Sequence, residues 1–214
     1  MKEKNQNNDR VKNFGEVFTN PKEVEAMLNL VKNETQRIES RFLEPACGDG
    51  NFLIKILERK LDIVEKKYNN SQIEYERYAF QAICSLYGVE ILKDNVSSCR
   101  DRLYNHFKKI YEKFFLTNLN SKFLSSIKYI ISRNILWGDA LTLTEPNNKK
   151  PIIFSEWSFI KGSLVQRSDY TLSDLLSYRP FEEDSLFSEK GKEVIIPPPI
   201  KVFKPINYIE VGNV

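Results

Sequence analysis

The residues of this chain with the clearest chemical potential lie in the segment 42–53. Its apolar start leads to Glu44, and Gly48 and Gly50 follow before an apolar pattern of helical spacing begins at Phe52. This order predicts a buried strand, a tight turn and a helix, with glycines where the backbone approaches a ligand closely. A loop that grips pyrophosphate carries a third glycine and no carboxylate, because an acid repels an anion. The segment therefore favours a cationic or amine-bearing ligand, although an ordinary glycine turn in an α/β protein has the same residue types.

Two more acidic residues follow apolar runs later in the chain. Glu90 lies near the end of the run 87–91, and Asp139 follows the run 134–137 after one glycine. Both runs are predicted strands, and open parallel sheets bind ligands at the carboxyl ends of their strands. An acid at the tip of the second strand can accept hydrogen bonds from both ribose hydroxyls of a nucleoside. The alternative for Glu90 is a surface position without a ligand.

The rest of the pattern predicts the helices and strands that position these residues. Asn20 is a good N-cap, Pro21 fits the first helical position, and apolar residues at helical spacing extend this helix to about Ile38. The segment 62–82 is interpreted as an insertion that delays the second strand. Further helices are predicted at 52–61, 78–86, 96–114, 120–132 and 169–176, and further strands at 151–154 and 208–211.

Length and composition favour a soluble protein with one α/β domain, alone or with a small appendage. The 214 residues carry a net charge of +3, which permits contact with nucleic acid without arguing for it. No apolar run reaches the length of a membrane span, and the N-terminus lacks a signal-peptide core. We therefore expect a cytoplasmic protein with no membrane contact. A disordered tail is expected at 1–12, a cofactor-binding domain at 13–178 and a Pro-rich extended segment at 179–214.

Neither metal binding nor histidine chemistry is expected. Cys47, Cys84 and Cys99 are unevenly spaced and form no C-x-x-C pair. This predicts reduced thiols in the core rather than a disulfide or a zinc site. The only histidine, His106, falls on the predicted solvent side of a helix. Acid–base or metal chemistry built on histidine is therefore nearly excluded.

The stretch Leu43–Phe52, with the sequence Leu-Glu-Pro-Ala-Cys-Gly-Asp-Gly-Asn-Phe, resembles a known family. It is similar to cofactor-binding motif I of the N6-adenine DNA methyltransferases of restriction-modification systems. The resemblance is strongest to the class in which the cofactor motifs precede the catalytic motif. Gly15, Phe18 and Thr19 resemble motif X of that family, about 25 residues upstream, with Asn20 at or before the position of its proline. An ordinary capped helix start is the alternative interpretation of this upstream stretch.

Motifs II and III of the family also have counterparts here, in the family's order. The resemblance implies a doubly wound, mostly parallel sheet of the S-adenosylmethionine-dependent methyltransferase type, in truncated form. It implies S-adenosyl-L-methionine as the cofactor, which carries both a sulfonium and an amine. Residues that the resemblance assigns to cofactor binding are Phe18, Thr19, Glu44, Pro45, Ala46, Gly48, Gly50, Asn51, Phe52, Glu90, Ile91, Asp139, Ala140 and Leu141.

The catalytic motif of the family is the least well matched. The family places Asp, Asn or Ser, two prolines and an aromatic residue after its fourth strand, whereas this chain reads Ser155-Glu156-Trp157-Ser158. In such enzymes an acceptor side chain draws on the hydrogens of the adenine amino group, while the aromatic ring stacks on the extruded base. The resemblance thus implies Ser155 as the acceptor and Trp157 as the ring, with both prolines missing and the ring one residue early.

Three functions follow from these patterns. The first is an adenine-N6 DNA methyltransferase, or its cofactor-binding subunit, with DNA as substrate and a protein partner that supplies target recognition. The second is a non-catalytic scaffold or sensor that binds S-adenosylmethionine in a restriction complex. The third is a methyltransferase that acts on RNA or on another amino-bearing substrate. The segment after Leu141 is short for three more strands and a recognition region, so we expect a reduced enzyme or one subunit of an assembly.

Overall fold

The computed structural model describes residues 19–177 and 197–213. Its centre is a parallel sheet in the order β1-β2-β3, with Phe42 paired to Leu86 and Gly88 paired to Ile135. The prediction of an α/β fold with parallel strands is confirmed at this level. The three strands are β1 (Phe42–Glu44), β2 (Leu86–Glu90) and β3 (Ile135–Trp137).

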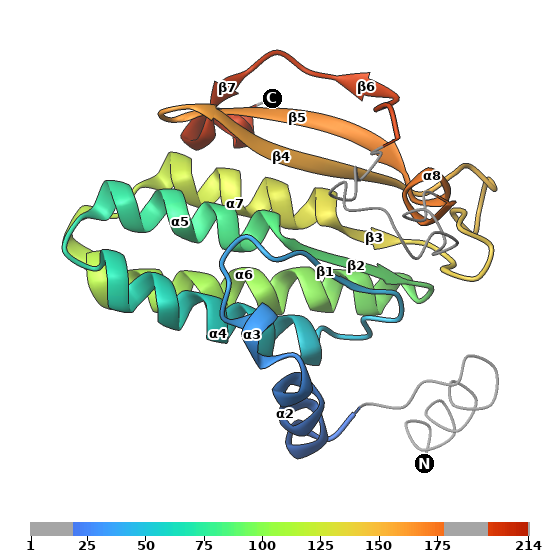
Figure 1. The fold of residues 1–214 in the computed structure, drawn as a ribbon, viewed down its shortest axis with the longest axis horizontal. Coiled ribbons are helices and arrows are strands. Elements are labelled where there is room, and N and C mark those ends of the chain that lie inside the picture. The colour runs from blue at the N-terminus through green and yellow to red at the C-terminus, as the bar shows by residue number, and fades with distance from the viewer. Residues whose placement is uncertain (1–18, 178–196, 214) are drawn as a thin grey trace, which may run out of the picture.

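Each connection between the parallel strands is a pair of helices (Figure 1). The predicted insertion at 62–82 is the helical hairpin of the first connection, in which the second helix begins at Gln72 rather than near Tyr78. Ser71 and Asn120 cap the second helix of each pair, since their side-chain oxygens accept from Glu74 N (3.4 Å) and Phe123 N (3.1 Å). The helices are α4 (Asn51–Tyr68), α5 (Gln72–Cys84), α6 (Lys93–Phe115) and α7 (Ser121–Asn134), with the 3-10 turn η1 (Leu116–Asn118) after α6.

The N-terminal helix is shorter than its apolar pattern suggested. Asn20 caps it as predicted, because its Oδ1 accepts from Lys22 N at 2.9 Å and Pro21 occupies the first helical position. The helix does not run to Ile38, because Val31 leaves the helical conformation at φ −116° and ψ 33°. Two short helices result, α2 (Pro21–Leu30) and α3 (Lys32–Thr35).

The region after Trp137 departs most from the predicted elements. The strand expected at 151–154 forms instead at 153–161, and it pairs antiparallel in a second sheet rather than joining the parallel one. Residues 169–171 are strand rather than helix, and 208–211 lie in a 3-10 helix rather than a strand. The elements are β4 (Ile153–Lys161), β5 (Leu164–Thr171), α8 (Leu172–Ser177), β6 (Lys201–Val202), β7 (Ile206–Asn207) and η2 (Tyr208–Asn213).

The parallel sheet lies between α4 and α6 on one face and the antiparallel sheet on the other (Figure 1). Leu53 and Cys99 belong to the large core on the helical side, and Ile152 and Phe154 pack with Val89 in a smaller core on the other side. The described part of the predicted extended C-terminal segment belongs to these layers, since β6 and β7 both pair with β5. The tail predicted at 1–12 lies outside the described residues.

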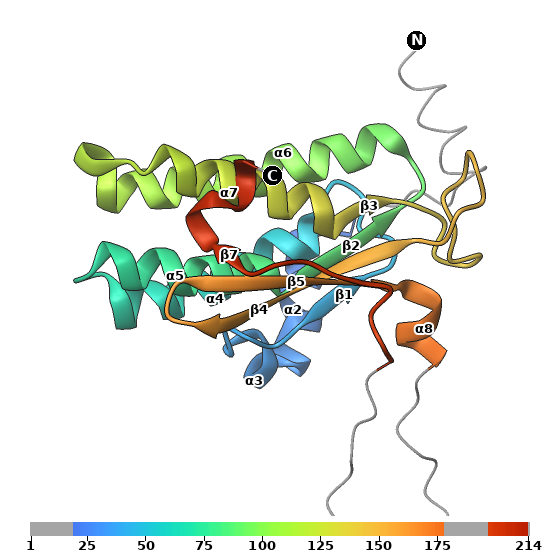
Figure 2. The same cartoon turned by 90° about the horizontal axis from the view of Figure 1, so that it is seen from above.

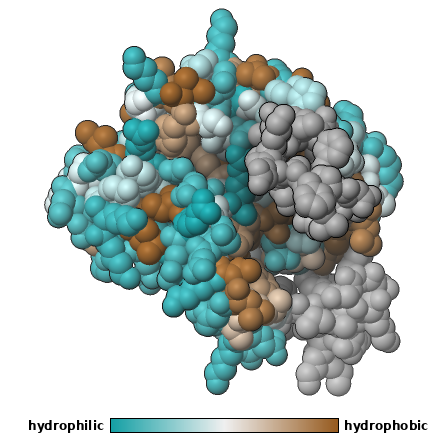
Figure 3. Space-filling model, in the orientation of Figure 1, coloured by the Kyte–Doolittle hydropathy of each residue, from teal (hydrophilic) through white to brown (hydrophobic). Residues whose placement is uncertain are grey.

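Within residues 19–177 and 197–213, no helix combines the length and the apolar character needed to span a bilayer. On the face drawn in Figure 3, hydrophobic residues form small separate groups among hydrophilic ones.

Candidate cofactor-binding site

The glycine loop joins β1 to α4 at the carboxyl edge of the parallel sheet. Gly48 and Gly50 adopt φ values of 52° and 95°, in the region that favours glycine. A Cβ at Gly50 would lie 2.7 Å from Cys99 Sγ, so the loop packs directly against α6. Cys47 N donates to Val89 O at 3.0 Å and ties the loop to β2. The loop is therefore held by its two neighbours in a shape that strongly favours glycine.

Glu90 lies between this loop and the end of β2. Its Oε2 accepts from Gly48 N and its Oε1 from Leu92 N, each at 2.8 Å, and the residue is 7% exposed. A carboxylate oxygen has two lone-pair sites, so each oxygen can accept one further hydrogen bond. The structure thus brings Glu90, Gly48 and the exit of β2 together, as the strand pattern predicted.

Asp139 marks the exit of β3 at the same edge of the sheet. Gly138 N donates to Glu90 O at 3.0 Å, which joins the exits of β2 and β3. Asp139 Oδ1 accepts from Leu141 N at 2.9 Å, and this backbone hydrogen bond is the main cause that lowers the pKa of Asp139. Ala140 is half-buried, whereas the side chain of Leu141 is 96% exposed. The carboxylate therefore holds its own turn and leaves Leu141 projecting from the edge.

The exit of β1 carries Glu44, which is half-buried. Burial raises the pKa of Glu44, and the N–H of Ala46 partly offsets this shift. Pro45 and Ala46 are exposed, and Ile91 at the neighbouring exit of β2 is 39% exposed. Carboxylates from all three strands thus share this edge with exposed apolar side chains.

Arg102 of α6 holds the loop, a role that the sequence pattern did not indicate. Its guanidinium forms an ion pair with Asp49, donates to Asp49 O at 2.7 Å and donates to Asn51 Oδ1 at 2.9 Å. Asp49 Oδ1 is buried with no hydrogen-bond partner among the described residues. The one sequence signal is position, because Arg102 lies three residues after Cys99 on the helix and so shares its face. Asn51 and Phe52 begin α4 beside this contact, and both are half-buried.

Thr19 is not joined to the loop by any hydrogen bond between described residues. It lies directly before α2, which packs along α4 through Arg59. Arg59 Nη1 donates to Leu28 O at 2.9 Å and to Thr35 Oγ1 at 3.1 Å, two turns beyond the start of α4. The other motif X residue assigned to the cofactor, Phe18, lies outside the described residues.

Trp157 lies at the opposite edge of the parallel sheet. Its Nε1 donates to Asn134 Oδ1 at 3.2 Å, and Asn134 directly precedes β3. Asn134 Nδ2 in turn donates to Leu86 O (3.1 Å), at the first residue of β2. These contacts place the ring at the amino ends of β2 and β3, so the structure does not bring Trp157 to the glycine loop.

Ser155 is also engaged away from the loop. It is fully buried, and its Oγ donates to Asp169 Oδ1 at 2.8 Å across the β4–β5 pair. Arg167 binds both oxygens of Asp169 at 2.7 Å, and its guanidinium lies 5.8 Å from the centre of the Trp157 ring. The catalytic roles that the resemblance implied for Ser155 and Trp157 draw no support from this arrangement.

The described residues contain no group of three or more His, Cys, Asp or Glu side chains that could hold a metal ion. The three cysteines are buried and unpaired by disulfides, as predicted. His106 was predicted on the solvent side of its helix, but it is half-buried against α4, with its Nε2 3.4 Å from Glu58 Oε1. Periodicity alone did not reveal this contact, because it depends on how α6 crosses α4.

Comparison of the chain with protein-family models, with curated proteins and with solved structures gave no match.

Proposed function

We propose that this chain binds S-adenosylmethionine at the carboxyl edge of its parallel sheet, as the cofactor-binding unit of an adenine-N6 DNA methylation system. The observation that carries the proposal is Glu90, a buried carboxylate held between the glycine loop and the exit of β2. An acid at this point suits the paired hydroxyls of a ribose. The sequence resemblance of motifs I, II and III supports the same assignment.

The chemistry of the edge supports a cationic nucleoside more than a phosphate. Glu44, Glu90 and Asp139 place carboxylates at the three strand exits, where they favour a sulfonium or an ammonium and repel phosphate. The unpartnered Asp49 Oδ1 offers one more acceptor for an amine. Exposed Leu141 and Ile91 suit the faces of a purine ring. When bound, the cofactor supplies an activated methyl group.

Methyl transfer in this proposal depends on a partner. The chain's own candidates for binding the adenine amino group, Ser155 and Trp157, are engaged by Asp169 and Asn134 at a distance from the glycine loop. We therefore propose that a second protein supplies the catalytic acceptor and the recognition of the DNA sequence. Such an assembly fits a restriction-modification system in the cytoplasm, with this chain contributing the cofactor.

A second candidate function rests on the same placement of Ser155 and Trp157. If no partner completes the site, the chain is a non-catalytic subunit whose cofactor occupancy reports methyl-donor supply to a restriction complex. Cofactor affinity is common to both functions. Methyl transfer to unmethylated genomic DNA, assayed with the products of neighbouring genes, separates them.

Glu90→Gln is expected to weaken the binding of S-adenosylmethionine about 5- to 150-fold. The amide offers one acceptor where the carboxylate offers two, and leaving a buried donor unpaired costs roughly 1–3 kcal/mol. Isothermal titration of both proteins measures the change, with the melting temperature recorded because Glu90 also binds backbone N–H groups. Glu112→Gln on α6 is the matched control and should bind as the wild type does. Undetectable binding of the wild type at millimolar cofactor would refute the proposal itself.

Trp157→Ala is expected to lower the free energy of unfolding by about 3 kcal/mol, the low end for truncating a Trp side chain, and to leave cofactor affinity unchanged. The ring is half-buried against Tyr129 and Asn134, so its loss opens a cavity between β4 and α7. Urea unfolding and cofactor titration of the one variant measure both quantities. Ile160→Ala, an exposed position on the same strand, should change stability by less than about 0.5 kcal/mol. Unchanged stability together with lost methyl transfer would instead assign Trp157 a role in base stacking.

A further inference from the structure

Three arginines lie near the amino end of β3. Arg100 of α6 covers the start of this strand, since its Nε donates to Ile135 O at 2.9 Å. Arg133 is the last residue but one of α7, and Arg167 of β5 donates from Nη1 to Tyr129 Oη of the same helix at 3.0 Å. Arg100, Arg133 and Arg167 therefore form one group of positive charges, the arginine cluster.

The acid that pairs with the cluster is Asp169, and Arg167 already neutralises it by donating to both of its oxygens at 2.7 Å. Arg133 Nη2 lies 4.0 Å from Asp169 Oδ2, which is beyond hydrogen-bond distance. The Nε of Arg133 is buried with no hydrogen-bond partner among the described residues. Burial lowers the pKa of Arg100, and the nearby charge of Arg133 lowers it further. The cluster therefore holds a surplus of positive charge around Arg133, whose guanidinium is partly shielded from water.

The strand β6 adds a lysine to the same surface. The chain from β6 to β7 runs beside β5, with which both strands pair (Figure 2). Lys201 is exposed and stands opposite Asp169 in the β5–β6 pair, so the two side chains project to the same face of the sheet. The Lys201 ammonium lies 4.5 Å from the centre of the Phe203 ring, and the Arg167 guanidinium lies 4.3 Å from the same centre. Lys201 thus extends the positive charge of the cluster to the surface.

We propose that the arginine cluster and Lys201 bind a single phosphate group. A guanidinium donates paired hydrogen bonds to phosphate oxygens, and Arg133 has donors available for them. A doubly charged anion also offsets the repulsion among these side chains. The charges converge around Arg133, whereas a nucleic-acid strand needs a row of contacts to successive phosphates. The ligand is therefore a small phosphate, either inorganic or carried as a monoester by a nucleotide.

This phosphate site lies apart from the proposed cofactor site. The cluster surrounds Ile135 at the amino end of β3, whereas Glu90 and the glycine loop lie at the carboxyl ends of the strands. The two edges also carry opposite charge, because carboxylates gather at the strand exits and arginines gather here. One edge suits a cation and the other an anion. The proposal does not depend on the binding of S-adenosylmethionine.

The test titrates the full chain with inorganic phosphate and with uridine monophosphate, which lacks the adenine ring of the proposed cofactor. Binding is followed by phosphorus nuclear magnetic resonance at constant ionic strength. Arg133→Gln should weaken the binding of both probes about tenfold or more, as expected for a lost hydrogen bond between charged groups. Lys201→Gln should weaken it about threefold, because an exposed charge contributes less. Arg37→Gln is the matched control, since Arg37 pairs with Glu34 and Glu39 on the surface, and it should bind both probes as the wild type does.

The two probes distinguish the sources of the phosphate group. Equal affinities would assign the site to phosphate alone, and tighter binding of uridine monophosphate would assign it to a nucleotide. No saturable binding by the wild type at millimolar concentrations of either probe would overturn the proposal, and so would equal weakening in Arg133→Gln and Arg37→Gln. Duplex DNA that binds more tightly than both probes, and less tightly to Arg133→Gln, would assign the surface to nucleic acid instead. If Arg133→Gln fails to fold, as judged by circular dichroism, wild-type binding by Lys201→Gln is the result that contradicts the site.

Discussion

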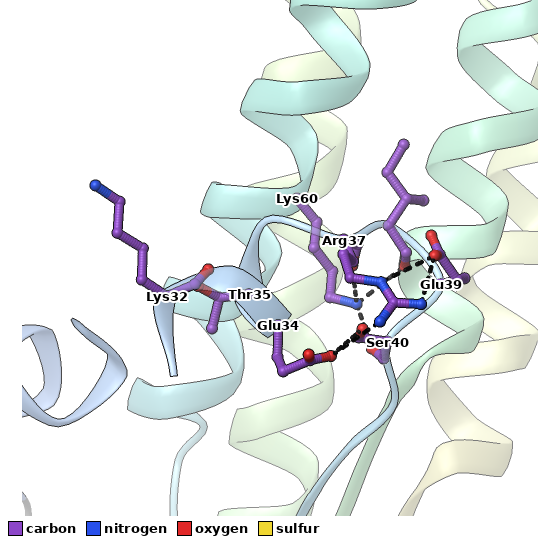
Figure 4. A network of polar contacts seen from close by, with 8 residues as sticks. Lys32, Glu34, Thr35, Arg37, Glu39, Ser40 and Lys60 are labelled. Carbon is purple, nitrogen blue, oxygen red and sulfur yellow. Dashed lines mark hydrogen bonds and ion pairs between the residues drawn. The ribbon is translucent and has the colours of Figure 1, made fainter. Parts of the chain in front are cut away.

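Replacing Lys60 with methionine is expected to lower the free energy of unfolding by about 2–6 kcal/mol, because two buried acceptors are left unpaired at roughly 1–3 kcal/mol each. Lys60 of α4 is fully buried, and its ammonium reaches into the segment that leads from α3 to β1 (Figure 4). Nζ donates to Arg37 O at 3.1 Å, to Ile38 O at 2.9 Å and to Ser85 Oγ at 2.7 Å, and it also contacts Ser40 O. Methionine has a similar volume but no donor, so these acceptors lose their partner inside the protein.

Urea unfolding of the variant measures this loss. Lys55→Met is the matched control on the same helix, because Lys55 is 39% exposed and, among the described residues, forms its ion pair with Glu58 on the surface. Its effect should stay below about 1 kcal/mol. Equal stabilities of the two variants would show that water replaces Lys60 at the three carbonyl groups without loss.

The pH dependence of the same pair of proteins tests the charge state of Lys60. Burial lowers the pKa of Lys60 to about 7, whereas the unfolded chain titrates near the ordinary value of about 10.4. Between these values the unfolded state binds the extra proton, so wild-type stability gains from Lys60 as the pH rises. The stability difference between the wild type and Lys60→Met should therefore widen from pH 7 towards pH 10. A difference that does not change with pH would mean that the ammonium stays charged throughout.

Gly50→Ala is expected to lower the free energy of unfolding by about 2–5 kcal/mol and to abolish the binding of S-adenosylmethionine that we propose. The residue sits at φ 95° and ψ 23°, where an L side chain costs roughly 1–2 kcal/mol. Its new Cβ would also approach Cys99 Sγ to 2.7 Å, and such overpacking costs a further 1–3 kcal/mol or so. Thermal and urea unfolding measure the sum.

Two further variants separate these causes. Gly162→Ala in the β4–β5 turn has φ 57° and no atom within 4 Å of the new Cβ, so it should show the backbone strain alone. Adding Cys99→Ala to Gly50→Ala removes Sγ and leaves the nearest remaining atom, Cys99 Cβ, at an ordinary 3.6 Å. In a double-mutant cycle, the double variant should recover the part of the unfolding free energy that the overlap of the new Cβ with Cys99 Sγ removes. If Gly50→Ala is no less stable than Gly162→Ala, α6 yields to the loop and the loop is not rigid.

Local pattern was sufficient for the parallel half of the molecule. The strands β1, β2 and β3 are short apolar-rich runs bounded by turn residues, and the Asn20 cap is a local hydrogen bond. Such features depend on residues close in sequence, and this is why their approximate positions could be predicted. The meeting of Glu90 with the glycine loop followed from one rule, that parallel strands end at a common edge.

Local pattern failed where a neighbouring strand or helix of the fold decides the local structure. Residues 169–171 have the spacing of a short helix, yet they are strand because β4 and β6 both offer backbone partners. The run 208–211 was predicted as a strand and forms a 3-10 helix packed on α7, where Gly212 N donates to Ser126 Oγ at 3.1 Å. Short apolar runs fit either state, so tertiary contacts choose between them.

The α/β class, the strand–glycine loop–helix unit at 42–53 and the acids at the strand exits could all be predicted from local pattern. The contacts of Arg102 with the loop and of Lys60 with the approach to β1 became visible only once the elements were packed together. Packing also places Ser155 and Trp157 away from the loop, because β4 pairs with β5 and not with the parallel sheet. The physical reason is range: the first set depends on periodicity and turn chemistry within a few residues, whereas the second depends on contacts between residues far apart in the chain.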